Sequence, residues 1–251
     1  MHDDAPVETA LLRDCPIAHP GPVSAVIAIH AITLTLPLAL TLATLQVLDA
    51  AEQRRWNGMH RPDDRDRFAT SRALAKAVIA LPLGRHPRSV TVTSVPGRRP
   101  QVVGIEACRL SISHTRDLVV VACCLQGEIG VDCEYIDRDL DTAALARRFF
   151  GAAEHHELSR LEGRQHSDGF FRLWTGKEAL AKASGAGLDE VLNADLHDLL
   201  VPPHQAHSGA WAVRSLPPIG DSAVAIAAAG SAWLHDVRRW DACELLHSWR
   251  G

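Results

Sequence analysis

The residues that could do chemistry begin with a pair of carboxylates in the segment IGVDCEYID. Asp132 and Glu134 are two positions apart in a β-branched run, so on a strand both point to one side. Further along the chain, Glu178 and Lys182 are four positions apart, so on a helix they share one face. Carboxylate oxygens are the ligands that a hard divalent cation such as Mg²⁺ prefers. The spacing therefore predicts a metal site made by a strand and a helix.

The element that must position Glu178 is a helix expected over Gly169–Leu188. Its apolar residues recur at helical spacing, and a Gly-rich end suits a helix C-terminus. These apolar residues are Phe170, Leu173, Trp174, Leu180 and Ala181. A Glu–Lys pair at this spacing is often only a solvated surface pair, worth about 0.2–0.5 kcal/mol. A tryptophan one turn before Glu178 favours a functional face, because a solvated face seldom needs one.

The sequences GVDCE and WTGKEALAKASGAGL together resemble the two signature motifs of the 4′-phosphopantetheinyl transferases of the surfactin-synthetase-activating type. The match covers nearly every fixed position, with a fitting separation. The resemblance implies an α+β fold of two similar subdomains related by a pseudo-twofold. Residues 1–126 would carry the coenzyme A nucleotide contacts, and residues 127–251 the metal carboxylates and the catalytic helix. It also implies transfer of 4′-phosphopantetheine from coenzyme A to a serine of an apo acyl or peptidyl carrier protein, with release of 3′,5′-ADP.

Under this resemblance the motif residues take individual roles. Asp132, Glu134 and Glu178 would hold Mg²⁺. Glu178, or a metal-bound water beside it, would accept the serine proton. Lys182 would contact coenzyme A and orient or protonate the phosphate oxygen that leaves with the nucleotide. The sequence has no GxSxG motif, which agrees with direct transfer to the incoming serine.

The charge-dense segment 50–72 runs into a basic helix. Asp63 or Asp64 can cap it, and it carries Arg67, Arg72 and Lys76. Basic residues on the flank of a helix are normally solvent-facing. Members of the family carry a comparable basic pattern here, and the resemblance implies that Arg72, with Arg67 as the weaker candidate, reaches the nucleotide of coenzyme A.

A strand expected over Ser89–Val95 leads to the turn PGRRP and then to LSISHT, whose alternation suits an edge strand. A histidine at the end of a strand is more often structural than catalytic. The step Ser113-His114-Thr resembles a third family motif, in which the histidine binds the phosphates of coenzyme A. Arg99 matches the basic residue of the family's turn, and the adjacent Arg98 leaves open which arginine contacts phosphate. Charge-assisted hydrogen bonds of this kind are the strong ones.

Composition narrows the class of protein. The chain has 251 residues, 47% hydrophobic and 22% charged, which is ordinary for a soluble globular protein. A net charge of −4 argues against a nucleic-acid partner. The 14 histidines form no metal-binding cluster. The six cysteines form no CxxC pair, which is typical of small buried side chains in a reducing compartment. We expect a cytoplasmic monomer with no membrane partner.

The main competing hypothesis concerns the largely apolar segment Val23–Leu48, which is long enough to span a bilayer. It contains His30 and Pro37 and is rich in Val, Ile and Thr, which favours strands. The interpretation is therefore a strand near Val23–Leu34 and a helix entering Ala43–Arg55. Two alternative functions remain open. One is a membrane-anchored interaction protein, and the other is a coenzyme A-binding protein without transferase activity.

The remaining elements are expected from apolar runs and periodicity. They are buried strands at Leu118–Leu125 and Ile129–Glu134, helices at Thr142–Phe150 and Ala152–Leu161, strands at Trp211–Leu216 and Ala223–Ala229, and an amphipathic C-terminal helix from Ala232 that includes Trp233, Val237, Trp240, Leu245 and Trp249. Glu154 matches an acidic position that in relatives lies close to the active site. An acid favoured by the dipole of a helix first turn explains it equally well.

Overall fold

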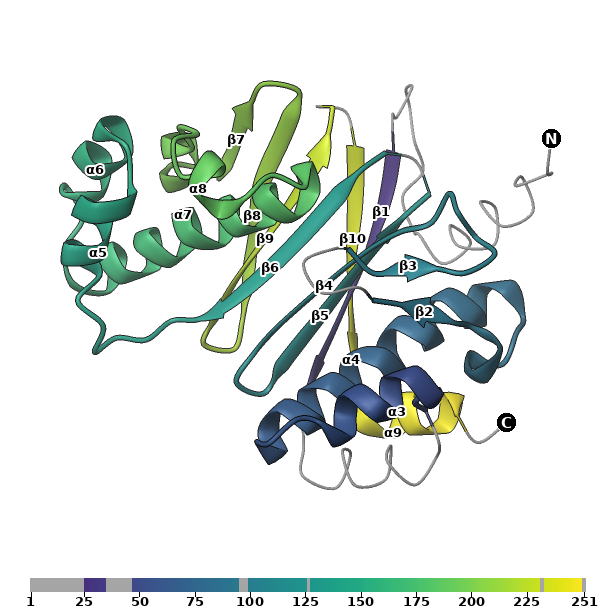
Figure 1. Ribbon diagram of the computed structural model, residues 1–251. Coiled ribbons are helices and arrows are strands. Elements are labelled where there is room, and N and C mark those ends of the chain that lie inside the picture. Colours follow the sequence, from purple (N-terminus) through teal and green to yellow (C-terminus); the bar gives the residue numbers. More distant parts are fainter. Residues whose placement is uncertain (1–24, 35–46, 95–98, 126, 231–232, 250–251) are drawn as a thin grey trace. The chain divides into compact units, whose positions relative to one another are not determined.

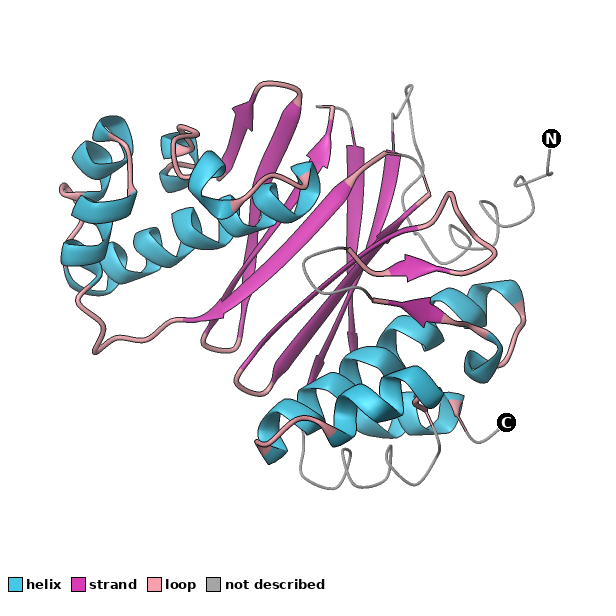
Figure 2. Cartoon of the chain, viewed as in Figure 1, coloured by secondary structure: helices cyan, strands magenta, loops and turns pink. Residues whose placement is uncertain are grey.

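The computed structural model describes residues 25–34, 47–94, 99–125, 127–230 and 233–249. Contacts divide the chain into two compact units, one made of residues 1–126 and 234–251 and the other of residues 127–233. Helices and strands are mixed in both units (Figures 1 and 2). The α+β fold class predicted from the sequence is confirmed.

The first unit is built on a six-stranded sheet in the order β10-β1-β5-β4-β3-β2 (Figure 1). Its strands are β1 (Ala25–Thr33), β2 (Val92–Thr93), β3 (Gln101–Val102), β4 (Arg109–Thr115), β5 (Leu118–Cys124) and β10 (Trp233–Trp240). β5 is buried at every position and lies between β1 and β4, antiparallel to both, as its continuous apolar run predicts. β4 lies between β5 and β3, but β3 pairs with it at Arg109, directly before the LSISHT segment, so the edge character expected of that segment stays a prediction.

The helices of the first unit are α3 (Ala50–Asn57), α4 (Pro62–Ala80) and α9 (Ala242–Ser248), with the short 3₁₀ turns η1 (Leu81–Leu83) and η2 (Pro87–Ser89). The predicted cap of α4 is wrong: Arg61 stands at the N-cap, and Asp63 and Asp64 lie in the first turn. Pro62 starts the helix because its fixed φ suits the first helical position. The two acids still stabilise this end, since negative charge is favourable near a helix N-terminus.

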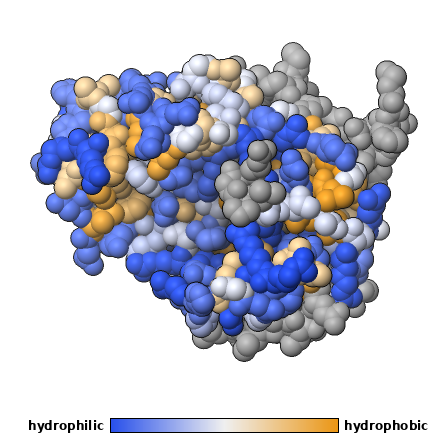
Figure 3. Space-filling view, viewed as in Figure 1, coloured by the Kyte–Doolittle hydropathy of each residue, from blue (hydrophilic) through white to orange (hydrophobic). Residues whose placement is uncertain are grey.

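The segment 25–57, which includes most of the long apolar stretch, is described in part. β1 confirms the expected strand, and α3 begins later than expected, because the Asp49 side chain caps it in a reciprocal capping box with Glu52. Residues 35–46, where the predicted break and helix entry fall, lie outside the described residues. Within the ranges given above, no helix is both long and apolar enough to cross a bilayer. The described atoms on the face shown in Figure 3 are largely hydrophilic, with smaller apolar areas between them.

The C-terminal segment corrects two expectations. Residues 233–240 form strand β10 rather than a helix, and only Ala242–Ser248 is helical. The spacing of the tryptophans fits a helix, but β10 adds to the sheet beside β1, and tertiary pairing overrides local periodicity. Leu245 and Trp249 are at most 1% exposed in the core of the first unit. Residues 234–251 therefore group with residues 1–126, whereas the sequence division placed them with the second subdomain.

The start of α9 gives a testable prediction. The Asp241 carboxylate accepts a hydrogen bond from the Glu244 amide at 2.7 Å. Removal of such a cap costs about 0.5–2 kcal/mol, so Asp241→Ala should lower the free energy of unfolding by that amount in urea. The exposed Glu106→Ala control should stay within about 0.5 kcal/mol of the wild type. Equal stability of both variants would contradict a helix that begins at Ala242.

The second unit places helices against a four-stranded antiparallel sheet in the order β6-β9-β8-β7. The strands are β6 (Ile129–Tyr135), β7 (Gln205–Ser208), β8 (Trp211–Ile219) and β9 (Ser222–Ala229); the helices are α5 (Thr142–Phe149), α6 (Ala152–Leu158), α7 (Gly163–Ser184) and α8 (Leu188–Val191), with the 3₁₀ turn η3 (His197–Leu200). The predicted strands and helices are all present, although α6 ends earlier and α7 begins earlier than expected. α7 ends where Gly185 takes a left-handed conformation with φ of 74°.

α7 lies unusually close to β6. A Cβ atom built at Gly130 would stand 2.1 Å from the Ala179 carbonyl oxygen and 2.4 Å from the Ala183 amide nitrogen. Only glycine leaves room for backbone to approach backbone in this way. Gly130 shares its strand face with Asp132 and Glu134, so this face of β6 is the one that meets α7.

Candidate functional site

The second unit brings the motif residues of β6 and α7 together. Asp132 is only 3% exposed and Glu134 is half-buried, both on the face of β6 toward α7. Glu178 and Lys182 lie one turn apart on α7, and both are half-buried. The Lys182 Nζ atom donates to Asp132 Oδ1 at 2.7 Å, which ties the helix to the strand. Two carboxylates on a strand thus face a third carboxylate and a lysine on a helix.

The charges of this group are crowded. Burial, the negative charge on Asp132 and then that on Glu178 raise the pKa of Glu134 to about 7, against an opposing effect of Lys182. Burial first, and Asp132 second, also raise the pKa of Glu178, and Lys182 again opposes them. Like charges that share a partly buried site disfavour the ionised forms. A cation would relieve this repulsion.

The fit to a divalent metal rests on the donor chemistry. Among the described residues, no three His, Cys, Asp or Glu side chains already stand in the arrangement of metal ligands. The positive charge beside Asp132 is that of the Lys182 ammonium. Carboxylate oxygens that are partly buried and mutually repelling are nevertheless what a hard cation needs. The three acids fit Mg²⁺ in chemistry, and their role as its ligands stays a prediction.

A pH dependence of stability follows from Glu134. Its pKa of about 7 in the folded protein lies above the ordinary 4.5, so the protonated carboxyl favours folding. That contribution is complete below pH 4.5 and is lost as the pH rises through 7. In EDTA, we therefore expect the Tm of the wild type to fall relative to Glu134→Gln between about pH 5 and pH 8. Differential scanning fluorimetry measures this difference. A gap between the two proteins that does not change with pH would contradict the expected titration.

A buried ion pair next to Glu178 was missed by the sequence analysis. Lys177 and Glu154 are both 0% exposed, and Lys177 Nζ stands 2.8 Å from Glu154 Oε1. Lys177 also donates to the Leu192 and Ala194 carbonyls, and Glu154 accepts from the Leu196 amide. Glu154 also lies in the first turn of α6 and accepts from the backbone there, as the helix-terminus explanation expects. The sequence showed Lys177 and Glu154 at motif positions, but no sequence pattern indicates that the two side chains contact each other.

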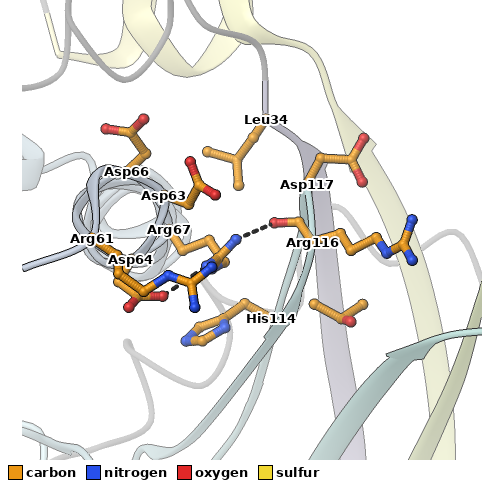
Figure 4. A pocket seen from close by; sticks show the side chains of 10 residues that line it. Leu34, Arg61, Asp63, Asp64, Asp66, Arg67, His114, Arg116 and Asp117 are labelled. Atoms are coloured by element: carbon orange, nitrogen blue, oxygen red, sulfur yellow. Dashed lines mark hydrogen bonds and ion pairs between the residues drawn. The ribbon is translucent and has the colours of Figure 1, made fainter.

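The first unit contains a cavity of about 640 Å³ at the start of α4 and the turn between β4 and β5 (Figure 4). It is lined by Leu34, Arg61, Asp63, Asp64, Asp66, Arg67, His114, Thr115, Arg116 and Asp117. Arg67 is fixed in it: Nη2 donates to Asp64 Oδ1 at 2.7 Å and Nη1 to the Arg116 carbonyl at 2.8 Å. His114 is exposed beside this arginine (Figure 4). Basic side chains and carboxylates therefore alternate around the cavity, with Asp64 paired to Arg67.

The structure places Arg72 elsewhere. It is 4% exposed, its Nε atom is 3.5 Å from Glu52 Oε1, and its Nη2 atom donates to Ser94. The guanidinium also lies 5.1 Å from the centre of the Phe68 ring. Lys76 Nζ joins the same cluster at 2.6 Å from Glu52 Oε2, so the solvent-facing flank expected of α4 is wrong for both residues. Burial lowers the pKa of Arg72, and Glu52 opposes that effect.

The other predicted coenzyme A contacts are also located. Ser113 is 6% exposed in β4, directly before His114. Arg99 is half-buried just before β3, and Arg98 lies outside the described residues. Only His114 of the predicted set, together with the weaker candidate Arg67, lines the cavity. The metal-side residues and these phosphate-side residues belong to different units.

Comparison with known proteins bears on the family of the chain. Residues 128–228 match the model of the 4′-phosphopantetheinyl transferase superfamily. The chain is 30% identical over 182 residues to slr0495 of Synechocystis sp., a protein assigned to the 4′-phosphopantetheinyl transferases, covering 70% of this chain and 74% of that protein. It is 29% identical over 191 residues to the 4′-phosphopantetheinyl transferase HetI of Nostoc sp., covering 74% and 80%. A Bacillus subtilis 4′-phosphopantetheinyl transferase is 24% identical over 151 residues, covering 60% and 66%.

The family match and these relatives show that the protein is a transferase. The chain belongs to the 4′-phosphopantetheinyl transferase superfamily.

Proposed function

We propose that this enzyme transfers the 4′-phosphopantetheine group of coenzyme A to a serine of an apo acyl or peptidyl carrier protein, in a Mg²⁺-dependent reaction that releases 3′,5′-ADP. The observation that carries the proposal is the group formed by Asp132 and Glu134 with Glu178 and Lys182 in a chain of this superfamily. We further propose the surfactin-synthetase-activating subtype, cytoplasmic and monomeric. The motif spacing and the presence of two units support the subtype.

In this reaction the serine Oγ forms a bond to the β-phosphorus of coenzyme A, and the bond to the bridging oxygen breaks. Asp132, Glu134 and Glu178 would hold Mg²⁺, which when bound neutralises charge on the pyrophosphate. Glu178 accepts the serine proton, a role that a carboxylate within hydrogen-bond reach of the hydroxyl can fill. Lys182 carries the proton or hydrogen bond that the leaving phosphate oxygen needs.

The nucleotide end of coenzyme A needs cationic donors, and the arginines that line the cavity of the first unit support a phosphate site there. Arg67 is held in place by Asp64 and the Arg116 carbonyl, so little conformational entropy is lost when it binds an anion. His114 stands beside it (Figure 4). We propose that these two residues bind a phosphate of coenzyme A by charge-assisted hydrogen bonds. Arg72, Arg99 and Ser113 remain candidates for contacts with coenzyme A. Arg67 is a better candidate than Arg72, because Arg72 is buried with Glu52.

Product analysis tests the proposal. With an apo carrier protein and Mg²⁺, chromatography should show one 3′,5′-ADP formed for each coenzyme A consumed, and none in EDTA. Arg67→Ala should raise KM for coenzyme A more than it changes kcat, because it removes binding common to ground and transition states. Coenzyme A binding with no 3′,5′-ADP from any carrier would refute the transferase and leave a coenzyme A-binding protein.

A further inference from the structure

The buried pair Lys177–Glu154 is placed to control the catalytic helix. Lys177 directly precedes Glu178 in α7, and its ammonium reaches the Leu192 and Ala194 carbonyls as well as Glu154. Glu154 in turn binds the amides of Gly151 and Leu196. One ion pair thus joins α7, α6 and the segment before η3.

α7 is also held on its other side by close backbone contact. Gly130 of β6 leaves no room for a side chain against Ala179 and Ala183. On the side of η3, a Cβ atom at Gly176 would stand 2.5 Å from Leu199 Cδ1. The helix therefore lies between β6 and η3 with little freedom to move toward either. What remains is rotation or sliding, and the fixed Lys177 ammonium opposes both.

We propose that Lys177 and Glu154 are positioning residues for the transfer reaction, which set the rotation of α7 and thereby aim Glu178 and Lys182 at Asp132 and Glu134. This inference rests on the proposed function. Lys177 acts through geometry, because its ammonium is bound to Glu154 and to the Leu192 and Ala194 carbonyls and so holds α7 in one rotation. A rotation of α7 that moved the Glu178 carboxylate by about 1 Å would cost on the order of a hundredfold in rate. Glu154 is in this account neither the base nor a metal ligand.

The test must separate positioning from folding. Loss of Lys177 alone leaves a buried carboxylate unpaired, which destabilises any protein strongly. The double variant Glu154→Gln/Lys177→Met removes both charges, and replacement of a whole buried pair is often neutral for stability. A matched control is Glu157→Gln/Arg160→Met, which removes the neighbouring exposed pair at 3.4 Å.

We expect the double variant to melt close to the wild type, with kcat lower by about a hundredfold and Mg²⁺ binding in calorimetry at least about tenfold weaker. The control pair should match the wild type in each measurement. Native-like kcat and Mg²⁺ binding in a stable double variant would reduce the pair to a structural role and overturn the proposal.

Two further arms cover the other outcomes. If the double variant does not fold, Glu154→Asp replaces it, because this substitution keeps both charges but moves the carboxylate away from Lys177. We expect kcat to fall at least about tenfold, with KM for coenzyme A unchanged. An unchanged kcat overturns the proposal. If the wild type transfers nothing to any carrier, the proposed function fails, and the Mg²⁺ titrations still decide. Weaker Mg²⁺ binding in the variant supports positioning, whereas equal binding, or none in the wild type, overturns it.

Discussion

Glu178→Gln is expected to lower kcat by a factor of about 10²–10⁴, the usual contribution of a general base. The amide keeps the size of the side chain but can neither accept the serine proton nor offer a charged oxygen to Mg²⁺. Because Glu178 is half-buried on α7 with Asp132 acting on its pKa, the substitution removes negative charge from a crowded site. Stability in EDTA should therefore be kept or improved. Steady-state kinetics together with thermal unfolding separates the two effects.

A matched control uses the same substitution just before the same helix. Glu162 is exposed at the N-cap of α7, so Glu162→Gln should leave kcat unchanged. If Glu178→Gln retained near-normal turnover, the assignment of this carboxylate as base and as metal ligand would be wrong. A loss of activity accompanied by unfolding would point to packing instead.

Gly130→Ala is expected to cost about 3 kcal/mol of stability or more and to lower activity as well. The new methyl group would meet backbone atoms of α7 at 2.1 and 2.4 Å, and backbone cannot turn aside as a side chain can. α7 must therefore move away from β6, which carries Glu178 and Lys182 away from Asp132. Urea unfolding measures the first effect and carrier modification the second.

Gly187→Ala is the control for the general effect of a glycine substitution. It lies at the N-cap of α8 with φ of −68° and no atom within 4 Å of its added Cβ, so the change should shift stability by no more than about 1 kcal/mol. Similar stability of Gly130→Ala and Gly187→Ala would contradict the close packing of β6 against α7.

The sequence predicted most of the second unit because its local signals agree with the final packing. The β-branched run of β6, the helical periodicity of α7 and the terminal Gly185 each fit the structure they adopt. The C-terminal segment was misjudged because Trp233, Val237 and Trp240 fit a helical spacing, whereas β10 adds to the sheet beside β1. That neighbour lies far away in sequence, so no local pattern reveals it.

Part of the candidate site depended on contacts that a sequence does not display. Arg67 and Arg72 are five positions apart on one helix and read alike, yet one lines the cavity and the other is buried with Glu52. Likewise, Lys177 and Glu154 become a pair only when α6 packs near α7. Charged residues are almost never fully buried unless paired, so sequence analysis expects such residues to be exposed.

The transfer reaction itself is tested most directly by intact mass spectrometry of an apo carrier protein incubated with this enzyme, coenzyme A and Mg²⁺. The account predicts a gain of roughly 340 Da, the mass of one phosphopantetheinyl group, in a direct phosphoryl transfer. The gain should vanish in EDTA and with Glu178→Gln. No gain with any carrier, although coenzyme A binds, or a gain that EDTA does not affect, would contradict a metal-dependent phosphopantetheinyl transferase.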